Sequence, residues 1–217
     1  MTFDWLYALE ILPELIDATL ITIRIALLGY LVSLGVGLLL ALARLSRNRW
    51  LSTSVWAISE GIRLTPLLVQ LFFAYYVLPA FGLRLPAEPT GVLVIGIHYS
   101  TYISEVYRAG IRSVPTGQWE ASVALGLPTQ ATWVRIILPQ AVRPMVPALG
   151  NYLIQLFKEV PLLSTITVYE LLNTANLLAG SSFKYLEALT LVGVIFFTLS
   201  YPSSLLFRRM EVKSADK

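Results

Sequence analysis

The sequence predicts an all-α membrane protein, a polytopic bundle of about five transmembrane helices. Hydrophobic residues make up 56% of the 217 residues, the mean hydropathy is +0.70, and only 13% of the residues are charged. A soluble domain carries about 25% charged residues. Several apolar segments approach the roughly 20 residues that a helix needs to cross a bilayer core of about 30 Å. The length therefore allows about four to six spans in one domain, without a separate soluble domain.

Five apolar segments are the candidate spans, and Pro, polar or charged residues separate them. An amphipathic helix is expected over residues 51–62, where apolar residues recur with helical period, and Pro66 should break or kink it. The segment 161–178 has helical periodicity but carries many Thr and Asn residues, so it is not counted as a span. The five spans cover roughly residues 15–42, 64–81, 91–111, 142–157 and 185–207.

The distribution of Lys and Arg predicts the orientation, because these residues accumulate on the cytoplasmic side of a membrane. If the five spans cross the membrane in alternating directions, Arg84 and Lys184 are the only basic residues in the connections on one side. We therefore expect the N-terminus outside and the C-terminus in the cytoplasm. The first apolar segment lacks a preceding basic region and a small-residue cleavage site, so it reads as a retained span. The twelve basic residues of the other side are Arg44, Arg47, Arg49, Arg63, Arg108, Arg112, Arg135, Arg143, Arg208, Arg209, Lys213 and Lys217.

The loop 117–139, on the cytoplasmic side, is the most informative segment because it reads as two short helices between spans. Glu120 is expected in the first turn of the first helix, where a negative charge offsets the helix dipole. Gly126 stands where a left-handed cap would end that helix, a conformation that glycine adopts without a Cβ penalty. Thr129 is expected to cap the second helix, and Pro139 to end it or to begin the next.

Three interpretations of the loop 117–139 follow from these residues. Ala121 and Ala124 keep one face of the first helix narrow, which permits close approach by a partner. The loop could also pack under the bundle without binding anything. A DNA-reading helix-turn-helix needs a second helix that is free to enter a groove, and here that helix is apolar and leads into a span.

The loop also resembles the signature of ABC importer permeases, which is Glu-Ala-Ala, three residues, Gly, nine residues and Ile-x-Leu-Pro. Ser122 replaces the third motif residue. The resemblance covers roughly residues 14–210, with 117–139 as the ATPase-coupling loop within that permease domain. The segments 63–70, 102–111 and 151–172 resemble blocks of the polar amino-acid branch, and Pro161 to Ser164 with His98 to Ser100 resemble permeases for ectoine and hydroxyectoine. The residues on the signature spacing are Glu120, Ala121, Gly126, Ile136, Leu138 and Pro139.

The resemblance implies a multi-pass permease in the cytoplasmic (inner) membrane of a prokaryote. Its implied partners are an external solute-binding protein, a second permease subunit that is identical or paralogous, and a cytoplasmic ABC ATPase dimer. None of the thirteen glycines is followed by Lys, so the chain lacks the Gly-Lys-[Ser/Thr] phosphate loop. We therefore expect no cofactor, no metal and no catalytic residue in this chain, and no nucleic-acid partner, with ATP used by the partner ATPase.

Ionisable residues inside spans are costly and are candidates for function. Lys158 and Glu159 could supply the cationic and anionic contacts that a zwitterion such as an amino acid or ectoine needs. They could equally lie at the outer interface and reach water. Glu105 is a second candidate, with pairing to Arg108 or Arg24 as the structural alternative. His98, the only histidine, could contact a ligand or form a hydrogen bond within the third span.

Other classes of membrane protein fit less well. A zinc protease of the His-Glu-x-x-His type needs two histidines, and an aspartyl protease needs paired Asp residues inside spans, where Asp17 stands alone. A secondary transporter commonly has more spans with internal repeats, and a channel does not need a cytoplasmic docking loop. A secondary transporter or channel subunit for a small polar solute is kept as the alternative.

Overall fold

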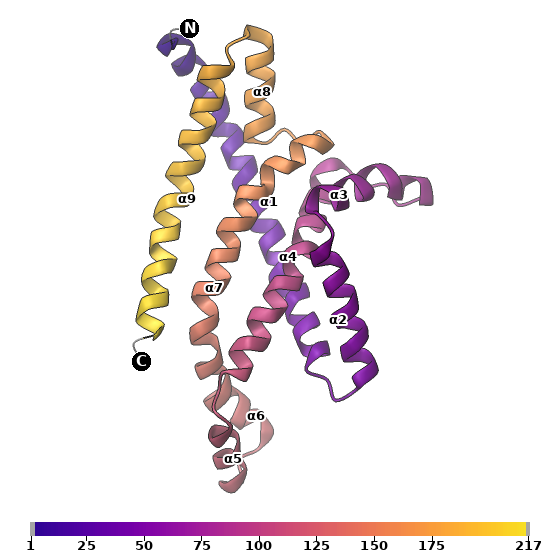
Figure 1. The fold of residues 1–217 in the computed structure, drawn as a ribbon. Coiled ribbons are helices and arrows are strands. Elements are labelled where there is room, and N and C mark those ends of the chain that lie inside the picture. Colours follow the sequence, from indigo (N-terminus) through magenta and orange to yellow (C-terminus); the bar gives the residue numbers. More distant parts are fainter. Residues whose placement is uncertain (1–2, 216–217) are drawn as a thin grey trace.

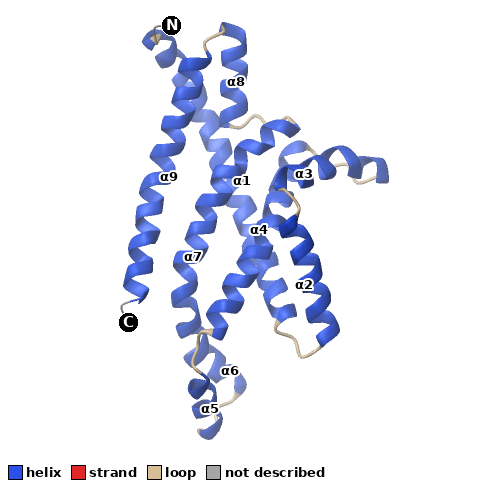
Figure 2. Ribbon diagram, viewed as in Figure 1, coloured by secondary structure: helices blue, strands red, loops and turns tan. Residues whose placement is uncertain are grey.

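The computed structural model describes residues 3–215, and every regular element in this range is helical (Figures 1 and 2). Lys217, which counts toward the predicted cytoplasmic charge, lies outside this range. The π-helical turns cover Phe73–Val77 and Thr132–Ile137, and 3-10 turns cover Leu78–Phe81 and Val160–Ile166. The α-helices are α1 (Trp5–Arg44), α2 (Arg49–Leu64), α3 (Leu67–Phe72), α4 (Ala87–Arg112), α5 (Thr116–Ala124), α6 (Thr129–Ala131), α7 (Leu138–Glu159), α8 (Leu171–Ser182) and α9 (Tyr185–Ala215).

The contact between α1 and α4 is the most extensive between any two elements of the described chain. The two helices run in the same direction, and glycines bring their backbones together. A Cβ atom on Gly37 would lie 2.9 Å from Ile103 Cγ2 and 3.0 Å from the Ser100 carbonyl oxygen. One on Gly96 would lie 2.7 Å from Val32 Cβ. Small residues at helix contacts permit this close approach in membrane proteins.

Two of the predicted spans lie in helices that are long and apolar enough to cross a membrane. These helices are α1, and α9 over Tyr185–Phe207. The predicted third and fourth spans form α4 and α7, whose bounds match the prediction within a few residues. The predicted second span, 64–81, is not a continuous helix. It begins at a bend of 100° after α2 and continues as α3, a π-helical turn and a 3-10 turn.

Gln70 stabilises this bend. Pro66 ends α2 as the sequence predicts, because a proline inside a helix lacks the N–H that the helix needs. The Gln70 Nε2 group donates to the carbonyls of Ile62 (2.7 Å) and Thr65 (3.0 Å), which lie at the break. Gln70 Oε1 lies 3.2 Å from His98 Nδ1 on α4. Inside a bilayer, the carbonyls that lose their backbone partners at a helix break need other hydrogen-bond donors, and here a side chain supplies them.

The remaining helices complete the bundle around α1. Figure 1 shows α7 and α9 beside α1, with α8 near the N-terminus and α5 and α6 at the opposite end. The segment 161–178 does not form one helix, because a 3-10 turn ends at Thr167, which has a left-handed backbone, and α8 starts only at Leu171. At the N-terminal end, the Asp4 carboxylate caps α1 and pairs with Lys184 at 2.7 Å. These contacts fix the start of α1 to the start of α9.

Candidate functional site

The loop 117–139 forms two short helical segments joined by a tight left-handed turn at one end of the molecule (Figure 1). Gly126 has φ of 65°, as the sequence predicts for the cap of α5. Its N–H donates to the Val123 carbonyl (2.9 Å), and the Leu127 N–H donates to the Ser122 carbonyl (3.1 Å). This pair of hydrogen bonds is the Schellman motif, which satisfies carbonyls at the end of a helix.

Two details of the loop differ from the sequence prediction. Glu120 is the fifth residue of α5, so it lies in the second turn, because the helix starts at Thr116 rather than at Gly117 or later. Thr129 is not the cap of the second helix. Pro128 occupies the cap position and Thr129 is the first helical residue. Pro139 lies in the first turn of α7, which follows the π-helical turn Thr132–Ile137 without a break.

The outer surface of the loop exposes apolar side chains that nothing in the described chain covers. Val123 is 79% exposed and Leu125 is 74% exposed. Glu120, Ala121 and Gly126 are exposed beside them. Apolar side chains grouped on a polar surface are typical of a binding surface. Among the other signature residues, Leu138 and Pro139 are exposed and Ile136 is half-buried.

The inner surface of the loop is anchored to the bundle by a separate small core. Trp119 and Trp133 pack edge to face with their ring centroids 5.1 Å apart. Both rest on a core of Val114, Ile137, Ala141 and Met145, the last two of which belong to α7. The loop is therefore packed directly against α7.

Ser122, which departs from the family signature, lies on the buried side of α5. It is 1% exposed and its hydroxyl donates to the Gln118 carbonyl at 2.7 Å. Because the hydroxyl is satisfied within the helix, Ser can occupy a buried position where the signature has Ala.

Glu105 lies in an ionic cluster. Its carboxylate accepts from Arg44 of α1 at 3.1 Å and from Arg108, one turn away on α4. Arg63 of α2 lies 4.0 Å from the same carboxylate. The predicted alternative of pairing with Arg108 is therefore correct. Pairing with Arg24 is wrong, because Arg24 binds Glu88 at 2.8 Å.

His98 forms the hydrogen bond that the sequence offered as its alternative role, and Gln70 is the partner. Around it lies an aromatic cluster that the sequence analysis did not find. Tyr99 and Tyr102 of α4 pack against His98, and Tyr152 of α7 packs against both tyrosines with centroids 5.8–6.2 Å away. The spacing of the tyrosines along α4 can be read from the sequence, but the packing of Tyr152 from α7 against them cannot.

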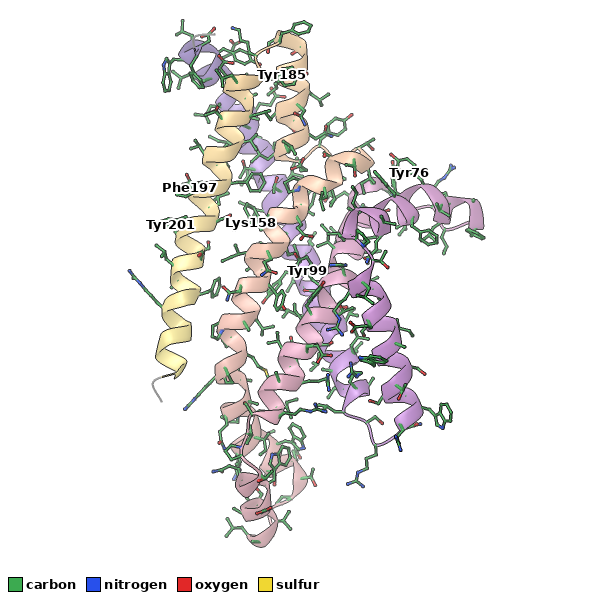
Figure 3. The ribbon with its side chains drawn as sticks, in the orientation of Figure 1. Tyr76, Tyr99, Lys158, Tyr185, Phe197 and Tyr201 are labelled. Atoms are coloured by element: carbon green, nitrogen blue, oxygen red, sulfur yellow. The ribbon has the colours of Figure 1, made fainter. Side chains whose placement is uncertain are left out.

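Lys158 and Glu159 are adjacent in the chain, but their side chains lie in different environments, one exposed and one half-buried. They therefore do not form a single site with two charges. Figure 3 labels Lys158 on α7 together with Phe197 and Tyr201 on α9. Lys158 is exposed and lines a groove with these two aromatic residues and Ser200. Glu159 is half-buried. The four candidate residues therefore do not gather in one site, and Glu105 and His98 lie about two turns apart on α4.

The described residues contain no group of three His, Cys, Asp or Glu side chains that could hold a metal ion.

Residues 33–213 match the family described as binding-protein-dependent transport system inner membrane component. The chain therefore belongs to this family, the membrane components of ABC transport systems. Members of this class are transport components, and ATP hydrolysis is carried out by a separate subunit in such systems.

Two relatives and one solved structure are similar over nearly the whole chain. A probable amino-acid ABC transporter permease protein of Sinorhizobium fredii is 45% identical, with 95% of this chain and 89% of the relative covered. The L-cystine transport system permease protein TcyB of Bacillus subtilis is 37% identical, with 92% and 87% covered. A crystal structure of an amino acid ABC transporter with histidines has a TM-score of 0.90 at 32% identity, covering 98% of this chain and 100% of that one.

Proposed function

We propose that the chain is the permease subunit of an ATP-driven importer that carries an amino acid or a closely related small zwitterion. The observation that carries this proposal is the loop 117–139, which is anchored to α7 on one side and exposes Val123 and Leu125 on the other. An apolar surface on a rigid support is what docking to a partner requires. The names of the relatives, which refer to amino acids and L-cystine, support the substrate class.

In this mechanism the partner ATPase dimer binds the exposed surface of α5 and moves it when ATP binds. The motion passes through Trp119 and Trp133 to α7. A second permease subunit, identical or paralogous, completes the pathway, and an external solute-binding protein delivers the substrate. Loaded binding protein and ATP-driven closure both favour the outward-open state, which is a shift between two existing conformations.

A narrower possibility for the substrate is ectoine or hydroxyectoine. Residues 98–100 and 161–164 resemble the corresponding segments of permeases for these solutes. The amino-acid names of the relatives favour an amino acid over ectoine. Because Lys158 and Glu159 do not form one two-charge site, Lys158 is the candidate for a contact with the carboxylate of a zwitterion, from the groove beside Phe197 and Tyr201. Lys158→Ala is then expected to lower uptake without releasing the ATPase, whereas unchanged uptake would assign Lys158 to the membrane interface.

The proposed topology has five spans, with the N-terminus outside and the C-terminus in the cytoplasm of a prokaryotic inner membrane. The apolar helices α1 and α9 and the positive charge near the loop 117–139 support it. The bent pair α2 and α3 would count as one broken span. Cysteine labelling from outside should modify Phe183→Cys in intact cells and leave Val123→Cys unmodified, and the reverse pattern would invert the topology.

The experiment that tests the function is affinity purification of the tagged protein from its native host, followed by uptake with labelled amino acids and ectoine. We expect an ABC ATPase in the eluate and competition for uptake by the preferred amino acid. A homo-oligomer without an ATPase would overturn the proposal and favour a channel or secondary transporter. Preference for ectoine would retain the importer and change only its substrate.

A further inference from the structure

The ionic cluster around Glu105 joins three helices near the end of the molecule that carries the loop 117–139. Arg44 is the last residue of α1, Arg63 lies in the last turn of α2, and Glu105 and Arg108 belong to α4. Glu60 completes the cluster with a 2.6 Å contact to Arg63. In the described residues, no third carboxylate lies within 4.0 Å of these arginines.

The cluster carries one more positive charge than negative charge, since it has three arginines and two glutamates. The arginine side chains are shielded from solvent, with exposed fractions of 12% for Arg44, 19% for Arg63 and 9% for Arg108. A surplus cation that is removed from water is destabilising unless an anion compensates it. Arg112, one turn further along α4, adds positive charge on the same side.

Unpaired donors gather at the same place. Five buried side-chain nitrogen or oxygen atoms of the described chain have no hydrogen-bond partner, and four of them belong to this region. They are the Nε atoms of Arg44, Arg63 and Arg108, and the hydroxyl of Ser59, which is 1% exposed and lies one turn before Arg63 on α2. Buried polar groups are normally satisfied, so several orphaned donors beside surplus positive charge indicate a site for an acceptor.

The position of the cluster favours phosphate as that acceptor. Arg47 lies in the short connection after α1, Arg49 is the first residue of α2, and Trp50, which follows it, is 86% exposed. Trp and basic residues together are typical of the membrane interface, and basic pockets between helices on the cytoplasmic side bind lipid headgroups. Guanidinium groups also match phosphate oxygens with paired hydrogen bonds.

We propose that the arginine cluster of α1, α2 and α4 is a binding site for a phosphate-type oxyanion. The anion compensates the surplus charge, accepts from the orphaned guanidinium and Ser59 donors, and holds α2 against the α1–α4 pair. This matters because Ser59 is the one fully buried side chain of α2, so α2 has little packing of its own to hold it. The source of the phosphate is either a lipid headgroup of the inner leaflet or free phosphate. The proposal uses the proposed orientation but is independent of the proposed substrate.

The test is a thermal unfolding series on the purified full-length chain in detergent, with the partners that copurify. One arm adds inorganic phosphate, with sodium chloride at equal ionic strength as reference, and the other adds phosphatidylglycerol, with phosphatidylcholine as reference. Saturating ligand should raise the unfolding midpoint by about 2–4 °C or more, because a ligand that binds only the folded state stabilises it. Arg63→Gln leaves two arginines and two glutamates, and should abolish the shift.

Arg24→Gln is the matched control, since it removes an arginine from the exposed pair with Glu88 and should keep the shift. If Arg63→Gln does not fold, Ser59→Ala is the alternative variant, because it removes one donor only. It should raise the phosphate concentration that gives half of the maximal shift in the unfolding midpoint by about tenfold. A shift with phosphatidylglycerol alone identifies a headgroup, a shift with phosphate alone a free ion, and a shift with both a site open to either. No shift in either arm, or a full shift in Arg63→Gln, would overturn the proposal whether or not the chain imports amino acids.

Discussion

The contact between α1 and α4 and the loop 117–139 both depend on glycines, but for opposite reasons. Gly37 and Gly96 lie where a side chain would collide with the neighbouring helix, so the lack of a side chain is what lets the two helices pack closely. Gly126 has open space around it and is needed for its positive φ. The first region is closed and gives the molecule its stability. The second is open, presents apolar side chains to solvent, and is the surface that we propose binds the ATPase.

Gly37→Leu should break the closed region and give the largest effect. The added side chain would press on Ile103 and on the Ser100 carbonyl, and overpacking of this kind costs typically about 1–3 kcal/mol or more. We expect most of the folded protein to be lost, as measured by monodisperse yield in detergent. Gly35→Leu is the control two residues away, where nothing lies within 4 Å, and its yield should be normal. Equal yields for both variants would contradict close packing of α1 on α4.

Val123→Asp should break the open region without affecting the closed one. The side chain is 79% exposed, so folding should be unchanged, while a charge in a desolvated docking surface should cost at least about 2 kcal/mol, or roughly 30-fold in ATPase affinity. Retention of the ATPase on the tagged protein is the measurement. Phe183→Asp makes the same kind of change at the opposite end, where the side chain is 86% exposed, and should retain the ATPase. Full retention by Val123→Asp would remove this residue from the docking surface.

Gly126→Ala sharpens the comparison, because it changes conformation rather than surface chemistry. A Cβ atom in the left-handed region costs roughly 1–2 kcal/mol, although no neighbour is displaced. We expect a modest loss of ATP-dependent uptake and faster protease cleavage within the loop, at normal yield. Gly117→Ala in the same loop has an ordinary φ and open surroundings, and should behave like the unmodified chain. Identical cleavage rates for the two variants would show that the turn does not require glycine.

Asp4→Asn should have the smallest effect, since the carboxylate and Lys184 are both exposed. The hydrogen bond from Lys184 lowers the pKa of Asp4 below its usual 3.8. The pair therefore contributes stability above pH 3.8 and loses it as the pH falls through the lower folded-state pKa. Asn can still cap α1, so unfolding midpoints of the variant and the unmodified chain should differ slightly at pH 7 and converge once the pH falls below the lowered pKa of Asp4. A difference that does not shrink as the pH is lowered would assign the effect to capping.

The sequence predicted features that depend on neighbouring residues and missed those that depend on distant ones. The left-handed turn at Gly126 and the break at Pro66 were correct, because both follow from the backbone preference of a single residue. The capping role of Thr129 was wrong, since the preceding Pro128 already occupies the cap position. The docking role of the loop rests on the family resemblance and its exposed surface, and it stays a prediction.

The cluster around Glu105 shows the limit most clearly. Arg108 was foreseen because it lies one helical turn away. Arg44 and Arg63 reach the same carboxylate from 61 and 42 positions earlier in the chain, through helix packing that no local pattern encodes. The grouping of Lys158 with Glu159 failed for a different, local reason, because adjacent residues on a helix point about 100° apart.

The Gln70 contacts at the α2–α3 bend have a mechanical consequence. A single amide bonds two carbonyls at the break, so one side chain replaces the backbone hydrogen bonds that a continuous helix would have there. Because the same side chain also contacts His98, the bend is tied to α4. A change at position 70 would therefore alter the end of α2 and its connection to α4 together.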